Sequence, residues 1–133
     1  MRIVAISDLH GYLPPVPPCD LLVVVGDLCP DHVDGSVHAR EEPGVQLAWM
    51  RSAFRTWMDR VPLPASHKVC TWGNHDFAGE GVDAVSLGRE LGITLAIDEV
   101  VTPGGMRVWV SPWCNPLPGD WAFVKPVEQL REV

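Results

Sequence analysis

The sequence predicts an α/β fold built around a mostly parallel sheet. Short apolar runs at 2–7, 21–25 and 68–72 indicate strands, and apolar residues at helical spacing lie between the second run and the third. Alternation of strand and helix favours parallel strands joined by crossovers. Polar residues follow each of the three runs, and ligands of such sheets bind beyond the carboxyl ends of the strands. The sequence therefore predicts a site at that edge of the sheet.

The first two strands are predicted from short apolar runs on either side of a proline-rich connector. "RIVAIS" (2–7) is β-branched and ends at polar residues, which is typical of a buried strand. "YLPPVPPCD" (12–20) is expected to be a connector, because proline donates no backbone hydrogen bond. "LLVVV" (21–25) has the unbroken apolar character of a parallel strand covered on both faces.

A change of period then predicts the main helix. Its apolar residues, at helical spacing, are Leu47, Met50, Phe54, Trp57, Met58 and Val61, and Pro62 and Pro64 end it. "KVCTW" (68–72) is the third strand, and "VDAVSLGREL" (82–91) is a short helix that Gly92 caps. "ITLAID" (93–98) predicts a fourth strand, and residues 99–111 predict a hairpin that turns near Gly104 and Gly105.

Length, charge and cysteine spacing limit the classes of protein. The 133 residues suit one domain over 1–133, and a net charge of −7 without Lys/Arg clusters argues against long nucleic acid as a partner. We find no signal peptide and no apolar stretch long enough to cross a bilayer, so we expect no membrane partner and a cytoplasmic location. The four cysteines lack C-x-x-C spacing, which argues against a structural zinc site and agrees with reduced thiols.

Side chains with metal-binding atoms follow each of the first three strands. "SDLHG" comes after the first strand, "GDLC" after the second and "GNHD" after the third. If the strands are parallel neighbours, these groups meet at one edge of the sheet. The residues concerned are Asp8, His10, Asp27, Asn74, His75 and Asp76.

The chemistry of this set indicates divalent metal ions. Carboxylates gathered at one sheet edge repel one another unless a cation neutralises them. Carboxylate, imidazole and amide oxygen together suit Mn²⁺, Fe, Zn²⁺ or Mg²⁺. Two ions about 3.5–4 Å apart need a bridging carboxylate, and Asp27 is the natural bridge because it leaves the middle strand on a short side chain. We expect Asp8 and His10 to hold one ion, and Asn74 to contact the other through its side-chain carbonyl oxygen.

In combination, these motifs resemble those of the calcineurin-like metallophosphoesterase family. They stand here as Asp8-Leu9-His10, Gly26-Asp27 and Gly73-Asn74-His75-Asp76, and the likeness covers the whole chain. The late segment "SPWCNPLPGDWAF" (111–123) is similar to one branch, a group of small phosphodiesterase-like proteins. The resemblance implies the N-terminal part of a four-layer α/β-β/α sandwich, with a mostly parallel first sheet.

The resemblance also implies a mechanism. A two-metal centre hydrolyses phosphomonoesters or phosphodiesters, with a metal-bridging hydroxide as the nucleophile. The metal ligands would be Asp8, His10, Asp27 and Asn74. His75 would lie beside the phosphate and donate a hydrogen bond or protonate the leaving oxygen, and Asp76 would orient His75. The resemblance thus implies catalytic roles for His75 and Asp76.

The chain departs from the family pattern after the third motif. The family continues with G-H and G-H-x-H motifs, whose histidines complete both metal shells, whereas no histidine follows His75 here. We therefore expect the chain to lack the C-terminal portion of the domain, either as a fragment or as a genuine short form. A second ion would then depend on Asp27 and Asn74, or on a partner chain or oligomer. The tryptophans at 109, 113 and 121 are expected to form an uncovered apolar patch.

We expect lesser roles for the remaining polar residues near these motifs. Two loop histidines after the second motif are spare candidate ligands, and the histidine before the third strand is expected far from the site. A cysteine after the second motif is expected to be a small buried hydrophobe, and two loop acids are expected to be solvated. These residues are His32 and His38, His67, Cys29, and Asp31 and Asp34, in that order.

Three functions agree with these patterns. The first is a metal-dependent phosphoesterase acting on a phosphate-ester small molecule, with cyclic nucleotides, other phosphodiesters, nucleotides and phosphoproteins left open as substrates. The second is a non-catalytic protein that binds a single metal ion, or a subunit that needs a partner to complete the site. The third is an α/β domain whose motifs serve only turns and helix caps.

Overall fold

A four-stranded parallel sheet forms the centre of the structure. The computed structural model describes residues 1–31 and 42–132. Across the sheet the order is β1 (Ile3–Ser7), β2 (Leu21–Val25), β3 (Lys68–Thr71) and β4 (Thr94–Leu95), and each neighbouring pair is parallel. This order confirms the predicted α/β fold with a parallel first sheet.

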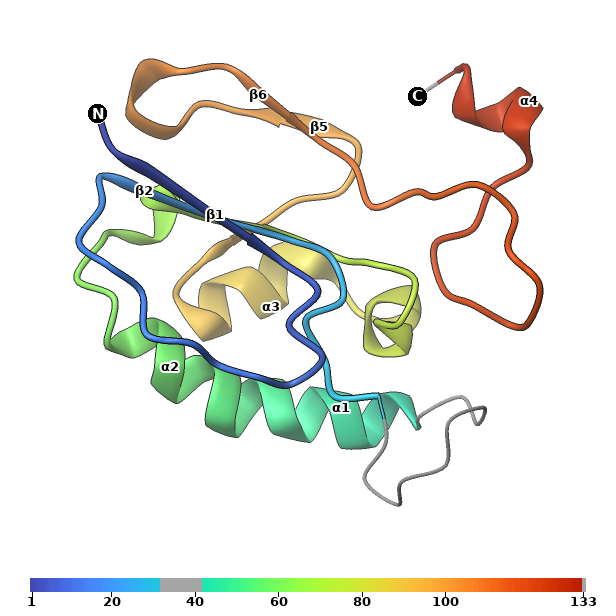
Figure 1. The fold of residues 1–133 in the computed structure, drawn as a ribbon, viewed down its shortest axis with the longest axis horizontal. Helices are drawn as coiled ribbons and strands as arrows, with labels where there is room; N and C mark the ends of the chain where they lie inside the picture. The colour runs from blue at the N-terminus through green and yellow to red at the C-terminus, as the bar shows by residue number, and fades with distance from the viewer. Residues whose placement is uncertain (32–41, 133) are drawn as a thin grey trace.

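Helices cover one face of this sheet. α1 (Pro43–Trp49), a π-helical turn (Met50–Phe54) and α2 (Arg55–Asp59) follow one another without a break between β2 and β3, and α3 (Ala84–Leu91) connects β3 to β4. Figure 1 shows these helices on the same side of the sheet, where they enclose the main hydrophobic core. α3 ends at Gly92 in the left-handed conformation, as predicted. Among the described residues, no helix has the length and apolar character that crossing a bilayer requires.

The spacing of buried residues explains why the helix contains a π-helical turn. Gln46, Met50 and Phe54 are all fully buried and recur every four residues. Each step of four residues carries an α-helix about 40° beyond a full turn, so such residues would drift away from the sheet. The wider π-helical turn opposes this drift. The three side chains therefore stay on the face that contacts the sheet and the loops at its edge.

The other face of the sheet is covered by a hairpin. β5 (Glu99–Val101) and β6 (Val108–Val110) pair antiparallel, and the chain turns through Pro103–Gly105 between them, as the sequence predicted. A second, smaller core lies between the hairpin and the sheet and includes Leu21, Val69, Ala96 and Val110. Figure 1 shows the hairpin opposite the helices, followed by the C-terminal segment with the short α4 (Val127–Leu130), which the sequence did not predict.

Three expectations about burial and length need correction. β1 was predicted to be buried, but its residues alternate between exposed and partly buried, and Ile3 is 47% exposed. β1 is an outermost strand in the sheet order, so among residues 1–31 and 42–132 it has a strand partner on one side only. β4 spans two residues of the predicted 93–98. Of the three tryptophans expected in an apolar patch, Trp109 is 51% exposed, whereas Trp113 and Trp121 pack partly buried against the main core.

Candidate metal centre

The first three strands end level with one another, which brings their following loops together. Ser7 pairs with Val25, and Val25 pairs with Thr71. Backbone hydrogen bonds continue past the strands, from Asp8 N to Gly26 O (3.2 Å) and from Gly26 N to Thr71 O (3.2 Å). The three polar motifs therefore emerge at one edge of the sheet, as predicted.

Asp8, His10 and Asp27 converge on one point at this edge. Each offers a ligand atom, and these atoms all lie within 4.8 Å of one another. His10 Nε2 lies 3.9 Å from Asp27 Oδ2. All three residues have left-handed backbone conformations, with φ of 53°, 43° and 50° respectively. Such conformations are uncommon for residues other than glycine and cluster at functional sites.

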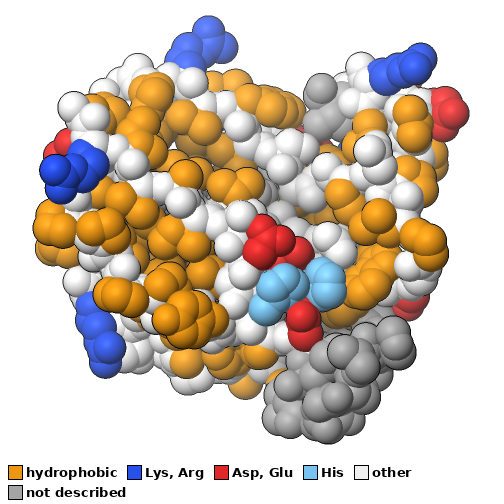
Figure 2. Space-filling view, viewed as in Figure 1, with side chains coloured by type: hydrophobic (Ala, Val, Ile, Leu, Met, Phe, Trp, Pro, Cys, Tyr) orange, Lys and Arg blue, Asp and Glu red, His pale blue; other side chains and the backbone are white. Residues whose placement is uncertain are grey.

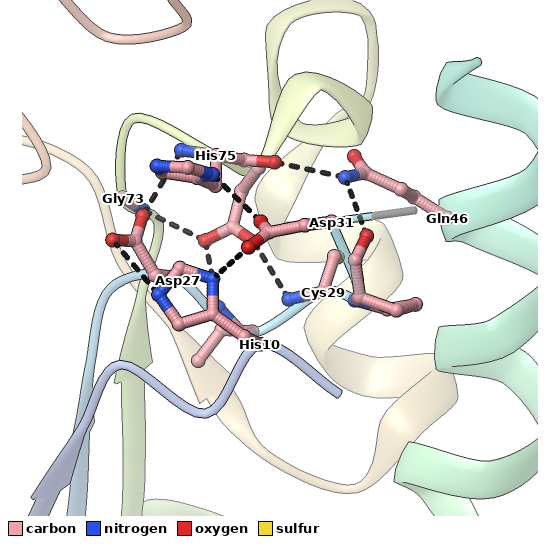
Figure 3. A network of polar contacts seen from close by, with 10 residues as sticks. His10, Asp27, Cys29, Asp31, Gln46, Gly73 and His75 are labelled. Atoms are coloured by element: carbon pink, nitrogen blue, oxygen red, sulfur yellow. Dashed lines mark hydrogen bonds and ion pairs between the residues drawn. The ribbon is translucent and has the colours of Figure 1, made fainter. Parts of the chain in front are cut away.

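Asp31 lies between two histidines, although we expected it to be a solvated loop acid. His75 Nδ1 is 2.6 Å from Asp31 Oδ1, and His10 Nδ1 is 2.8 Å from Asp31 Oδ2. Figure 3 shows the carboxylate pointing toward both imidazole rings. The two rings meet edge to face, with 4.8 Å between centroids. Asp31 comes four residues after Asp27, and an acid this close to the second motif is the signal that could have pointed to it.

Asp76 has a different role from the one expected, because its carboxylate is turned to the backbone. Asp76 is fully buried and accepts hydrogen bonds from the backbone N–H groups of Leu28 (3.1 Å), Cys29 (2.8 Å) and Gly73 (2.7 Å). The contact to the His75 ring that we expected from Asp76 is made by Asp31 instead. Asp76 thus joins the loop after β2 to the loop after β3.

Burial changes the pKa of Asp76 and of the neighbouring Cys29. Burial raises the pKa of Asp76 to about 6, although its three backbone hydrogen bonds act in the opposite direction. Burial, and then the nearby charge of Asp76, raise the pKa of the Cys29 thiol far above its ordinary value. Cys29 is fully buried, which confirms the expectation of a small buried hydrophobe.

Gly73 allows the second and third motifs to approach closely. A Cβ atom at this position would collide with the Asp27 carboxylate and with the Asp27 backbone nitrogen. The approach also lets the His75 backbone N–H donate to Asp27 Oδ1 at 3.0 Å. The glycine of "GNHD" therefore fixes where Asp27 stands relative to the third loop.

Gln46 supports these loops from α1, a role that sequence reasoning missed. Its side chain is fully buried. Gln46 Nε2 donates to His75 O at 2.8 Å and to Pro30 O at 3.5 Å, while Ala78 N donates to Gln46 Oε1 at 2.9 Å. Figure 3 shows the side chain reaching from its helix toward the site. A glutamine four residues before Met50 and eight before Phe54, in register with these apolar helix positions, is the signal in the sequence that could have pointed to it.

Asn74 and the C-terminal segment complete the surroundings. The Asn74 backbone carbonyl accepts from Ala122 N at 3.0 Å, and the role of its side chain as a ligand stays a prediction. The Trp121 ring lies against the His75 ring, with 4.5 Å between centroids. His67 precedes β3 at the opposite end of the strand, as expected. The spare candidates His32 and His38, and Asp34, lie outside the described residues.

The donor set fits a divalent cation. Two overlapping groups of ligand atoms, Asp8-His10-Asp27 and His10-Asp31-His75, share one histidine. His10 Nδ1 is inaccessible to solvent and lies 2.8 Å from Asp31 Oδ2, without the alignment of a good hydrogen bond. Burial lowers the pKa of His10, but the carboxylates of Asp31, Asp27 and Asp8 outweigh it and raise the pKa overall, which shows how negative the site is.

The charge of the surface around the site also suits a cation. Figure 2 shows the histidine side chains side by side with acidic side chains on either side of them, whereas the lysine and arginine side chains on this face lie toward its periphery. A site of this charge attracts cations, and it can approach a phosphate only when a cation lies between them.

Comparisons with models of protein families and with curated proteins find no match for this chain.

Proposed function

We propose that this protein is a divalent-metal-dependent phosphoesterase that acts on small-molecule phosphate esters. The observation that carries the proposal is the convergence of Asp8, His10 and Asp27 beside His75. Metal ligands alone favour a binding site, but an imidazole held at the rim by a carboxylate adds a group that can transfer a proton. That combination of cation site and proton donor is what hydrolysis of a phosphate ester needs.

Asp8, His10 and Asp27 would hold the cation, with Asn74 as a further oxygen ligand. When bound, a divalent ion supplies positive charge to the phosphoryl oxygens and lowers the pKa of water. Mn²⁺, Fe, Zn²⁺ and Mg²⁺ all suit these ligand types. Asp27 also accepts the His75 backbone N–H, so the loop that carries the proton donor is tied to a metal ligand.

His75 would protonate the leaving oxygen. Its Nδ1 faces Asp31, so for this step the ring would carry a proton on both nitrogens: Nδ1–H would donate to Asp31, and the proton on Nε2 would pass to the leaving oxygen. Gln46 holds the His75 backbone carbonyl, and Asp31 holds the ring, so both ends of the residue are fixed. In this proposal Asp31 takes the orienting role, and Asp76 acts indirectly by joining the two loops that carry Asp27 and His75.

We also propose that the sheet and the β5–β6 hairpin are the N-terminal part of a four-layer α/β-β/α sandwich. The hairpin covers the face of the sheet opposite the helices, which is where a second sheet would lie. The two described ligand groups share His10, so a second cation would depend on Asp27 and Asn74, on residues outside the described ranges, or on a partner chain.

Hydrolysis assays test the proposal. The purified protein is assayed on bis-p-nitrophenyl phosphate and p-nitrophenyl phosphate, with and without added Mn²⁺. We expect Mn²⁺-dependent turnover that Asp27→Asn abolishes and that His75→Ala reduces at least a hundredfold with little change in bound Mn²⁺. His67→Ala is the matched control and should keep full activity. Absence of Mn²⁺-dependent turnover on both esters would refute the proposal.

A single-metal binding protein without hydrolysis is the second candidate, and the shared His10 favours it. Because both groups use this residue, one cation satisfies it and excludes a second independent three-residue site among the described residues. Calorimetric titration with Mn²⁺ separates the candidates. One ion bound per chain without turnover supports this second function, whereas turnover supports the first.

A further inference from the structure

Trp121 stands beside the proposed proton donor. Its ring lies 4.5 Å from the His75 ring between centroids, with 40° between the planes. The side chain is partly exposed, and its indole N–H already donates to Pro118 O at 2.8 Å. Its polar atom is therefore satisfied within its own loop, so what Trp121 offers to a ligand is aromatic surface.

The segment that carries Trp121 is held firmly to the site. The next residue, Ala122, donates its backbone N–H to Asn74 O at 3.0 Å. Phe123 is buried, stacks on Trp72 with 6.4 Å between centroids, and meets Trp113 at 5.5 Å. A surface fixed in this way loses little freedom when a ligand packs on it, which favours binding.

We infer that Trp121 determines specificity by contacting the leaving group, and that the preferred substrates are phosphate esters of flat aromatic alcohols. This inference rests on the proposed function. If His75 protonates the leaving oxygen, the leaving group lies within a few ångströms of the His75 ring. The described residues place two rings against His75, and Trp121 is the larger and more apolar of the two, since the other is the proposed ligand His10. Aromatic rings pack favourably on an indole beyond their simple burial.

Flat aromatic groups fit the exposed surface of the Trp121 ring better than quaternary ammonium groups or saturated groups do. A quaternary ammonium group binds best inside a cage of several aromatic rings, whereas one indole and one imidazole at 40° form an open corner. Saturated groups of equal size bury similar area but lack the aromatic contribution. Aromatic leaving groups therefore suit the surface of Trp121 best.

Binding of phosphonates tests the inference separately from turnover. Affinities of the Mn²⁺-loaded protein for benzylphosphonate, cyclohexylmethylphosphonate and methylphosphonate are measured by calorimetry. We expect benzylphosphonate to bind about fivefold more tightly than its saturated counterpart. Trp121→Leu should bring this ratio close to one and leave methylphosphonate binding unchanged, and Trp121→Phe should keep part of the preference. Trp109→Leu, on the hairpin, is the control that should retain it.

The outcomes distinguish this inference from the proposed function. A ratio near one in the unaltered protein, or a preference that survives Trp121→Leu, overturns the role of Trp121 even if hydrolysis is confirmed. Tighter binding of phosphocholine than of phenyl phosphate would also overturn it. A preference that depends on Trp121 supports the inference even if turnover is absent, whereas failure of all three phosphonates to bind overturns both.

Discussion

Replacement of Gln46 by methionine should destabilise the protein strongly, although methionine matches glutamine in length. Gln46 is fully buried, and its amide group serves the His75 carbonyl and the Ala78 N–H. Methionine fills the same space but offers neither a good donor nor a good acceptor. The substitution therefore removes the hydrogen bonds and largely preserves the packing.

The expected magnitude follows from the groups left without partners. Each buried backbone group that loses its only partner costs about 1–3 kcal/mol, and two groups are affected, so we expect a loss of about 3 kcal/mol after partial relaxation. An unfolding entropy of about 2.1 cal/mol/K per residue gives about 0.28 kcal/mol/K for this chain. The melting temperature should then fall by about 10 °C.

Urea and thermal unfolding followed by circular dichroism measure this change. The dependence of the unfolding free energy on urea should stay constant, since the surface exposed on unfolding hardly changes. Gln129→Met is the matched control, because Gln129 is exposed on α4, and it should shift stability by less than about 0.5 kcal/mol. A loss below about 1 kcal/mol for Gln46→Met would show that α1 does not hold these loops through its side-chain amide.

Two further predictions concern the loops at the sheet edge. Gly73→Ala places a methyl group against the Asp27 carboxylate and should weaken Mn²⁺ binding, measured by calorimetry, at least tenfold. Gly44→Ala is the control, because the space around Gly44 is open, and it should leave Mn²⁺ binding unchanged. Equal effects of the two substitutions would contradict the reasoning. The raised pKa of Asp76, about 6 against an ordinary 3.8, means that the folded protein binds a proton that the unfolded chain has released between these values. Without added metal, stability should therefore fall by about 2 kcal/mol as the pH rises from 4 to 6. Urea unfolding should show this slope vanish in Asp76→Asn but persist in the exposed-site control Asp59→Asn.

The convergence of the three motifs was predictable because it depends on short-range patterns. Apolar runs of similar length give parallel strands whose ends are level, as the pairing of Ser7, Val25 and Thr71 shows. Residues that directly follow such strands must then lie near one another. Asp8 and Asp27 could be assigned to one site on this basis alone.

Asp31, Gln46 and Asp76 could not be assigned in the same way, because their roles depend on long-range geometry. Asp31 reaches the histidines only because the loop after β2 lies beside the two loops that carry them, and Gln46 reaches the loops only through the placement of its helix. Asp76 is adjacent to His75 in sequence, yet consecutive side chains point in different directions, and its carboxylate finds buried backbone donors instead. The exposure of β1 likewise depends on its outer position in the sheet, which no local pattern reveals.

The left-handed backbone at Asp8, His10 and Asp27 has an evolutionary consequence. Each such conformation costs of order 1 kcal/mol for a residue with a Cβ atom, and glycine would relieve the cost. Lineages freed from selection on this site would therefore drift toward glycine or asparagine at the three positions and become harder to unfold. In this chain, two aspartates and a histidine at these positions place ligand atoms at the edge of the sheet at a cost to the stability of the fold.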